Sequence, residues 1–250
     1  MVSPVSHRTV ARIAIGGFSL AVLAILALIV AGPGYRLGLW DFRPAFTIMR
    51  WAAYGGLAAA IFSLLGALGT WLGRMRRGFR LAVVGLLLGL LTAAIPWRWW
   101  RAAQRVPPIH DITTDTETPP AFIAILPLRR GAPNTADYGG PEVAAQQRSG
   151  YPDLAPLFLP HPPERAFTRA LTAAHEMGWN IVAAEPAEGR IEATDTTFWF
   201  GFIDDIVVRV RPEKNGSRID VRSVSRVGRS DIGTNAARIT AYLARIAATP

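Results

Sequence analysis

The first half of the chain consists mainly of long apolar stretches. Three of them contain no charged side chain: Ile13–Tyr35, Trp51–Gly73 and Leu81–Trp97, which are 23, 23 and 17 residues long. About 20 apolar residues in a helix span the hydrocarbon core of a bilayer. The pattern therefore predicts a transmembrane region over residues 1–105, with three helices at about 13–35, 51–73 and 81–97.

The placement of tryptophan agrees with this interpretation. Six of the eight tryptophans lie at or just beyond the ends of the apolar stretches, where an indole ring is favoured at the level of the lipid headgroups; they are Trp40, Trp51, Trp71, Trp97, Trp99 and Trp100. The first stretch is also longer than the apolar core of about 7–15 residues in a cleaved signal peptide. We therefore expect it to be retained as a helix.

The pattern changes after residue 105. Residues 106–160 are rich in proline and show a helical period only near Pro141–Ser149, which predicts an extended arm. Beyond residue 160, spacings of three and four predict one helix between Pro162 and Gly178 and another at about 233–247. Alternation of apolar and polar residues predicts four strands, at 179–184, 190–196, 204–211 and 217–226.

These elements predict an α+β domain over residues 161–250. We expect an antiparallel sheet of about four strands, with the two helices packed on its apolar face and its polar face exposed to water. The register of the last two strands follows from matching their apolar faces across a four-residue loop. That register pairs Pro212 with Ser217, Val210 with Ile219, Val208 with Val221 and Arg209 with Asp220.

Charge is divided unevenly between the two halves. Residues 1–105 carry twelve arginines and one acidic residue, Asp41, whereas residues 106–250 carry fifteen basic and seventeen acidic residues. The net charge of +9 therefore belongs to the flanks of the predicted spans, and nucleic acid is not an expected partner. The chain has no cysteine, which excludes disulfides, thiolate metal sites and cysteine nucleophiles.

The arginines near short loops predict the orientation in the membrane. Four arginines lie within the link Arg74–Arg80, which should face the cytoplasm together with the N-terminus. Three spans then place the C-terminal domain in the periplasm of a bacterium, with the chain crossing the inner membrane. No charged residue lies inside a span, so a transport path is not expected. Gly69–Gly73 and Gly85–Gly89 permit close helix contacts, within the bundle or between copies.

Four strings in the second half are distinctive: Pro107–Asp115, Tyr151-Pro152, Phe202–Asp205 and Ser223–Asn235. They resemble the family called domain of unknown function 1499, over about residues 105–248. The membrane half is also similar to an N-terminal extension of some bacterial members. The resemblance implies a membrane-associated or envelope domain and brings no activity, catalytic residue or cofactor.

Two sets of polar residues are candidates for function. Arg222, Arg226, Arg229 and Ser230 precede a predicted helix N-terminus, where guanidinium groups and free N–H groups can hold an anion such as a lipid phosphate. The nearby carboxylates can instead neutralise these arginines in structural ion pairs. The second set is a polar cluster of His110, Asp111, Asp115, Asp204, Asp205, Asp231 and Asn235. Adjacent residues in a strand point to opposite sides, so we expect this set to hold no metal.

The aromatic run Phe198–Phe202 precedes the third predicted strand. Such a run fits the core of a fold. It equally fits an apolar surface in contact with lipid, a ligand or an envelope protein.

The sequence as a whole predicts a binding or scaffolding protein of the cell envelope. Its expected partners are the lipid bilayer and either an anionic lipid or an envelope protein, without a cofactor. The alternative is a hydrolase acting on an envelope ester or phosphoester, because serines and histidines coexist in the second half. No nucleophile motif with recognisable spacing accompanies them, which favours binding over catalysis.

Overall fold

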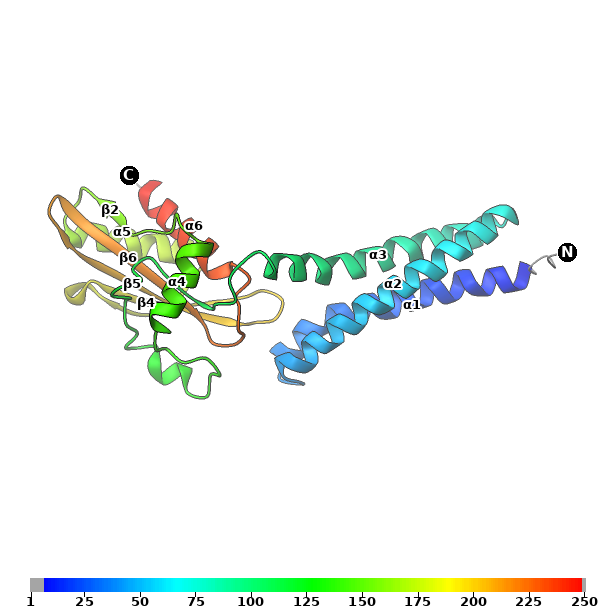
Figure 1. The fold of residues 1–250 in the computed structure, drawn as a ribbon, viewed down its shortest axis with the longest axis horizontal. Helices are drawn as coiled ribbons and strands as arrows, with labels where there is room; N and C mark the ends of the chain where they lie inside the picture. Colours follow the sequence, from blue (N-terminus) through cyan, green and yellow to red (C-terminus); the bar gives the residue numbers. More distant parts are fainter. Residues whose placement is uncertain (1–6, 249–250) are drawn as a thin grey trace. The chain divides into compact units, whose positions relative to one another are not determined.

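The computed structural model describes residues 7–248 of the chain, which form two compact units (Figure 1). The helical unit comprises residues 7–101 together with Phe198–Gly201. The sheet unit comprises residues 102–197 and 202–248. Residues 106–160, expected to form a separate extended arm, belong to the sheet unit.

The helical unit contains three long helices, α1 (His7–Arg36), α2 (Phe42–Leu72) and α3 (Arg76–Ala103). Each helix covers one of the three predicted spans to within one residue, and each is long and apolar enough to cross a membrane. Many large apolar side chains on these helices are exposed, as lipid-facing residues would be; examples are Leu23, Leu57 and Leu87.

Small residues allow the three helices to approach closely. A methyl group added at Gly17 of α1 would lie 2.7 Å from the backbone nitrogen of Ser63 in α2. One added at Gly85 of α3 would lie 2.9 Å from the Cα of Phe18 in α1. Gly85 thus takes part in packing inside the bundle. This is one of the two alternatives that the small-residue pattern Gly85–Gly89 left open.

Four residues from the second half of the chain, Phe198–Gly201, cluster with the helical unit. Phe200 is buried there, with its ring near those of Phe46 and Trp99. Phe198 is almost fully exposed. The aromatic run is thus divided between a buried ring and an exposed one.

The sheet unit is built on an antiparallel sheet of six strands, two more than the sequence predicted. Figure 1 labels β2, β6, β5 and β4. The strands follow the order β1-β6-β5-β4-β3, and β2 also pairs with β6. Their bounds are β1 (Asp111–Thr113), β2 (Leu157–Leu159), β3 (Asn180–Glu185), β4 (Arg190–Thr196), β5 (Ile203–Glu213) and β6 (Gly216–Ser225). The additional strands, β1 and β2, come from the segment expected to be irregular. Each has three residues, which is too short to produce a recognisable alternation.

The pairing of β5 with β6 has the register predicted from the sequence. Pro212 lies opposite Ser217, Val210 opposite Ile219, Val208 opposite Val221 and Arg209 opposite Asp220. The ladder continues by one further pair, Glu213 with Gly216, so that the loop is reduced to Lys214 and Asn215. Matching of the apolar faces, together with a short connecting loop, was therefore sufficient to predict this register.

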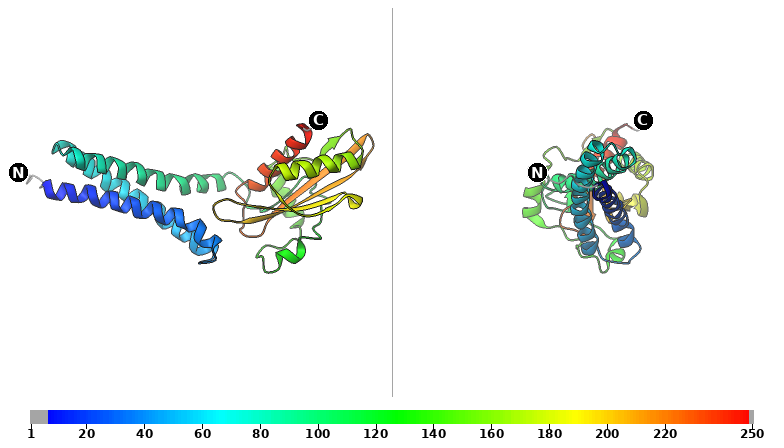
Figure 2. Two further views of the ribbon diagram at one scale, coloured as in Figure 1. Left: turned by 180° about the vertical axis from the view of Figure 1, so that it is seen from behind. Right: turned by 90° about the vertical axis from the view of Figure 1, so that its right-hand side faces the viewer.

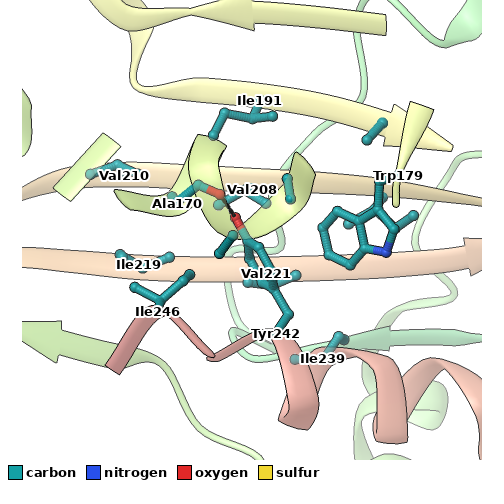
Figure 3. Packing of buried hydrophobic residues seen from close by; sticks show 14 of the residues in the cluster. Ala170, Trp179, Ile191, Val208, Val210, Ile219, Val221, Ile239, Tyr242 and Ile246 are labelled. Atoms are coloured by element: carbon teal, nitrogen blue, oxygen red, sulfur yellow. Dashed lines mark hydrogen bonds between the residues drawn. The ribbon is translucent and has the colours of Figure 1, made fainter. Parts of the chain in front are cut away.

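The main core lies between one face of the sheet and two helices, α5 (Pro163–Glu176) and α6 (Thr234–Ala248) (Figure 2). Tyr242 of α6 is fully buried, donates a hydrogen bond of 2.7 Å to the carbonyl oxygen of Ala170 in α5, and packs against Trp179 (Figure 3). The hydrogen bond thus joins α6 to α5, and the contact with Trp179 joins α6 to the segment that enters β3. We call this side of the sheet the helical face.

The opposite side of the sheet, the polar face, was expected to be exposed to water. Protein covers the part of it around Val207 and Val224, whereas the side chains of Arg209, Arg211 and Arg218 remain partly exposed. Phe122 and Ile125 pack on Val207 and Val224 of the central strands. The segment that contains Phe122 and Ile125 is fixed by Glu192, whose buried carboxylate accepts hydrogen bonds from the backbone N–H groups of residues 123, 124 and 125. It continues into a short 3₁₀ helix, η1 (Leu126–Arg129).

The remaining helix, α4 (Gly140–Gly150), closes the edge of the sheet beside β1. The side-chain amide of Gln147 accepts a hydrogen bond from the N–H of Thr113 at 2.9 Å and donates one to its carbonyl oxygen at 2.6 Å. A side chain thus takes the place of the next strand. An unpaired edge invites association with other chains, which this contact prevents at β1.

Candidate functional site

The polar face carries ion pairs that involve most of the residues singled out in the sequence. Arg222 on β6 is 3% exposed and donates to both carboxylate oxygens of Asp111 on β1, at 2.9 and 2.7 Å. The same guanidinium group donates to the carbonyl oxygens of Pro120 and Ala136. Arg222 is therefore neutralised and has its hydrogen-bonding groups engaged within the fold.

The rings of Phe122 and Tyr138 pack on this guanidinium group, with their centroids 5.2 and 5.5 Å from its central carbon. Such contacts favour a cation that has been removed from water. Burial raises the pKa of Tyr138 to about 12, and the negative charge of Asp111 acts in the same direction. Tyr138 is thus a neutral phenol at physiological pH and acts here as a packing residue.

Asp205 on β5 is the centre of a second cluster. It is fully buried and accepts hydrogen bonds from Arg226 on β6 at 2.9 and 2.8 Å, and from Arg129 of η1. Arg129 also donates to the carbonyl oxygens of Asn134 and Thr135, at 3.0 and 3.2 Å. This cluster fixes the position of the loop that follows η1.

Asp115 and Asp220 form a third cluster. The two carboxylates form ion pairs with three arginines of the polar face. These are Arg209, Arg211 and Arg218, with nitrogen–oxygen distances of 2.8–3.2 Å. Asp115 also accepts the N–H groups of Glu117 and Thr118. Burial alone would raise the pKa of Asp115, but these N–H groups and Arg218 and Arg209 lower it below its usual value.

Asn235, at the start of α6, organises a buried network on the helical face. It accepts from the hydroxyl of Ser223 at 2.6 Å, and its amide donates to the hydroxyl of Ser225 and the carbonyl oxygen of His110. Arg238 joins this network to Asp204 through an ion pair of 2.7 Å. Both serine hydroxyls are thus bonded to an amide rather than to a histidine, which is the arrangement of a structural network and not of a serine nucleophile.

Asp231 lies in the loop before α6 and caps that helix. Its carboxylate accepts the N–H groups of Gly233 and Asn235, at 3.1 and 2.5 Å. Burial raises its pKa above the usual value, against the effect of these two hydrogen bonds. Ser230 accepts the N–H of Ile232. Arg229 is exposed.

The structure therefore distributes the predicted residues over several sites. Of the expected anion-binding set, Arg222 and Arg226 each face a carboxylate, whereas Arg229 remains exposed. The expected polar cluster is divided among the three ion-pair clusters, the Asn235 network and the cap of α6. Within residues 7–248, no three histidine, aspartate or glutamate side chains gather as metal ligands.

The sheet unit also has a pocket, with a volume of about 420 Å³. One wall of the pocket is the segment Pro108–Asp111, which leads into β1. The second wall is the loop from Pro133 to Gly139. The third is the face of α4 that carries Glu142, Val143 and Gln146. The size lies within the range of about 300–1,000 Å³ typical of ligand sites. His110 and Asp111 are the two predicted site residues that line it.

The walls of the pocket are positioned by the buried arginines. Arg222 donates a hydrogen bond to the carbonyl oxygen of Ala136, and Arg129 donates to those of Asn134 and Thr135. Both ends of the loop segment 134–136 are thereby fixed to the polar face of the sheet. The side-chain amide of Asn134 adds hydrogen bonds to the carbonyl oxygens of Ser225 and Gly228. A loop without regular secondary structure is thereby held in one conformation.

The polar residues that line the pocket include three carboxylates, of Asp111, Asp137 and Glu142. Asp137 and Glu142 are exposed carboxylates at its rim, and Asp111 is neutralised by Arg222. The Oε1 atom of Gln146 is buried without a hydrogen-bond partner. A buried acceptor without a partner is costly, so this atom is a natural position for a donor group of a ligand.

Sequence reasoning missed several residues that shape this pocket. Arg129 and Asn134 lie in the irregular part of the predicted arm, and Gln146 lies in its short stretch of helical period, Pro141–Ser149. Their polar character was visible, but an arginine in a proline-rich segment carries no signal of burial. Such a signal arises only once the segment is known to cover the polar face of the sheet.

A family model described as protein of unknown function (DUF1499) matches residues 111–246 of the chain. No curated protein and no solved structure matches it.

Proposed function

The chain belongs to this family of proteins of unknown function, and we propose that it is a membrane-anchored binding protein of the bacterial cell envelope. The observation that carries the proposal is the pocket between residues 108–111, residues 133–139 and α4. Three helices able to span a bilayer precede it in the chain, so the pocket would be held close to a membrane.

The chemistry of the lining favours binding over hydrolysis. Ser223 and Ser225 are occupied by Asn235, and the carboxylates of Asp111 and Asp205 are occupied by arginines. A hydrolase needs a nucleophile or an activated water within reach of a base. A pocket of this volume, with walls held in one conformation and polar side chains converging on it, is by contrast a usual form of a ligand site.

The carboxylates of the lining also indicate the class of ligand. Asp137 and Glu142 bring two negative charges to the rim, and Gln146 offers a carbonyl-type oxygen. A primary ammonium group supplies a positive charge and three N–H donors, which complements all three residues. We therefore propose that the pocket binds a component that carries a primary ammonium group.

The ligand can be tested with the full chain in nanodiscs of phosphatidylcholine. Ethanolamine, glucosamine and lysine methyl ester serve as ammonium probes, and the forms in which every amino group is acetylated serve as neutral counterparts. The ammonium forms should raise the melting temperature of the protein and the acetylated forms should not. The variant Asp137→Asn/Glu142→Gln should lose the response.

A matched control removes the same two charges elsewhere. Asp153 and Glu117 are exposed and lie outside the pocket, so Asp153→Asn/Glu117→Gln should respond like the unchanged protein. If no ammonium probe stabilises the protein, or if both double variants respond equally, the pocket is not an ammonium site.

For the topology, we propose an inner-membrane protein with a cytoplasmic N-terminus and a periplasmic sheet unit. The arginine-rich link Arg74–Arg80 supports this orientation through the positive-inside rule. A reporter that is active only in the periplasm should be active when fused after Pro250 and silent when inserted in the link. The reverse pattern would invert the orientation.

A further inference from the structure

The loop that connects β6 to α6 has an unusual combination of order and exposure. We define the exit loop as residues 228–233. It is fixed by a hydrogen bond from Asn134 to the carbonyl oxygen of Gly228 and by one from the N–H of Asp231 to the carbonyl oxygen of Ile109. The carboxylate of Asp231 closes the loop against the start of α6. The side chains at its surface are thus presented in a fixed arrangement.

Ile232 is the most unusual residue of the exit loop. Its φ angle is +56°, a left-handed conformation that β-branched residues rarely adopt, and its side chain is 41% exposed. In water, both the backbone conformation and the exposure of the apolar side chain are unfavourable. The exposure ceases to be unfavourable if the side chain enters an apolar medium.

Two exposed arginines lie in or next to the exit loop. Arg229 in the exit loop and Arg105 in the adjoining segment are both exposed. The acidic residue of the exit loop, Asp231, has its carboxylate turned to backbone N–H groups at the start of α6. Residues 104–110 contain no acidic residue. These two arginines can therefore pair with an anionic partner.

Chain connectivity places this surface near the end of a membrane helix. A methyl group added at Gly233 would lie 3.6 Å from the side chain of Val106. Val106 is three residues beyond Ala103, the last residue of α3, and three residues extend by at most about 11 Å. The apolar part of α3 ends at Trp97–Trp100, aromatic residues of the kind that lie at the lipid–water boundary.

We propose that the exit loop contacts an anionic lipid surface, with Ile232 entering the headgroup region and Arg229 and Arg105 pairing with lipid phosphates. Anionic lipids attract basic residues close to a membrane, and an apolar side chain beside them adds a contact that salt does not screen. This contact is independent of the pocket. Of the arginines expected to bind a lipid phosphate, it retains Arg229 and adds Arg105, whereas Arg222 and Arg226 are paired with carboxylates.

The absence of cysteine makes the test direct, because one introduced thiol can be labelled specifically. In the full chain, Ile232→Cys is labelled with an environment-sensitive fluorophore. The labelled protein is placed in nanodiscs of phosphatidylcholine alone or of an equal mixture of phosphatidylcholine and phosphatidylglycerol. The quencher is a lipid with a nitroxide near its headgroup. We expect strong quenching at position 232, stronger in the anionic discs.

The control label is placed at Phe158, an apolar residue that is 58% exposed on β2. Phe158 lies opposite Arg218, seven residues along β6 from Ser225, which corresponds to about 23 Å. The label at position 158 should not be quenched. Equal quenching at both positions, or none at position 232, would overturn the proposal.

A charge reversal tests the role of the arginine. Arg229→Glu in the Ile232→Cys background should reduce quenching in the anionic discs severalfold and leave it nearly unchanged in the zwitterionic discs. Its melting temperature should stay the same, because Arg229 is exposed. Quenching that ignores both the lipid charge and Arg229→Glu would refute the pairing with phosphates. Binding of ammonium probes in the pocket should be unaffected in every variant.

Discussion

Arg222 and Asp111, which are 111 residues apart in the sequence, form a two-pronged ion pair at 2.9 and 2.7 Å beneath the wall of the pocket. Both side chains are almost fully buried, at 4% and 7% exposure. The pair joins β1 to β6, and the same guanidinium group holds the loop at Ala136. A sheet edge, a covering loop and a pocket wall thus depend on a single arginine.

This pair provides the first prediction. Arg222→Met leaves the carboxylate of Asp111 buried without a partner, which typically costs about 3–5 kcal/mol. We expect a large fall in the melting temperature of the full chain in detergent, followed by circular dichroism. Arg222→Met/Asp111→Leu should recover most of the loss, because the uncompensated charge is removed. Arg229→Met is the matched control and should have no effect; a similar fall in that variant would contradict this account.

A second prediction concerns the edge of the sheet at Gln147. Gln147→Glu can still accept from the N–H of Thr113, but its carboxylate cannot donate to the carbonyl oxygen. We expect a loss of about 1–3 kcal/mol in the free energy of unfolding at neutral pH. Acidification should reduce this loss, because a protonated glutamic acid regains a donor. Gln104→Glu, at an exposed position, should lose no stability at either pH.

The third prediction is a pH dependence at Asp115. Its pKa is lower in the folded protein than its usual value of 3.8, so the folded state favours the charged form. The stability that this carboxylate contributes is fully present above the usual value and is lost as the pH falls through the lower, folded-state value. Asp115→Asn should therefore be less stable than the unchanged protein at pH 7, and this difference should shrink below about pH 4.

Thermal melts of both proteins across this range check the prediction. Asp153→Asn, at an exposed position, should differ little from the unchanged protein at any pH. A stability difference at Asp115 that stays constant down to the acid limit would show that the hydrogen bonds, and not the charge, carry the contribution.

Packing of the helical unit gives a fourth prediction, with adjacent residues as a matched pair. A methyl group at Gly17 meets the backbone of Ser63 at 2.7 Å, whereas one at Gly16 meets nothing within 4 Å. Gly17→Ala should force α1 and α2 apart and lower the melting temperature in detergent. Gly16→Ala should leave it unchanged or raise it slightly, since alanine favours a helix by up to about 1 kcal/mol over glycine. Equal effects would mean that the two helices do not pack through Gly17.

The sequence by itself determined the elements whose signal is local. Apolar stretches long enough for a bilayer identified the three helices, and alternation located β3 to β6. The register of Val208 with Val221 also followed, because a slip of one residue would turn every apolar side chain to the wrong face. In the same way, Gly178 correctly indicated the end of α5: its φ of +75° is the left-handed conformation that glycine adopts most easily.

Only the tertiary structure decided which charged residues meet. Asp111 and Arg222 become neighbours because β1 pairs with β6, and a three-residue strand has too few positions to reveal that pairing in advance. Arg226 and Arg129 likewise share Asp205 only once η1 covers the polar face. Local periodicity reports how a segment turns its side chains toward or away from a core. The partner of a buried charge is set by the order of the strands and by the path of the covering loop, which are non-local properties of the fold.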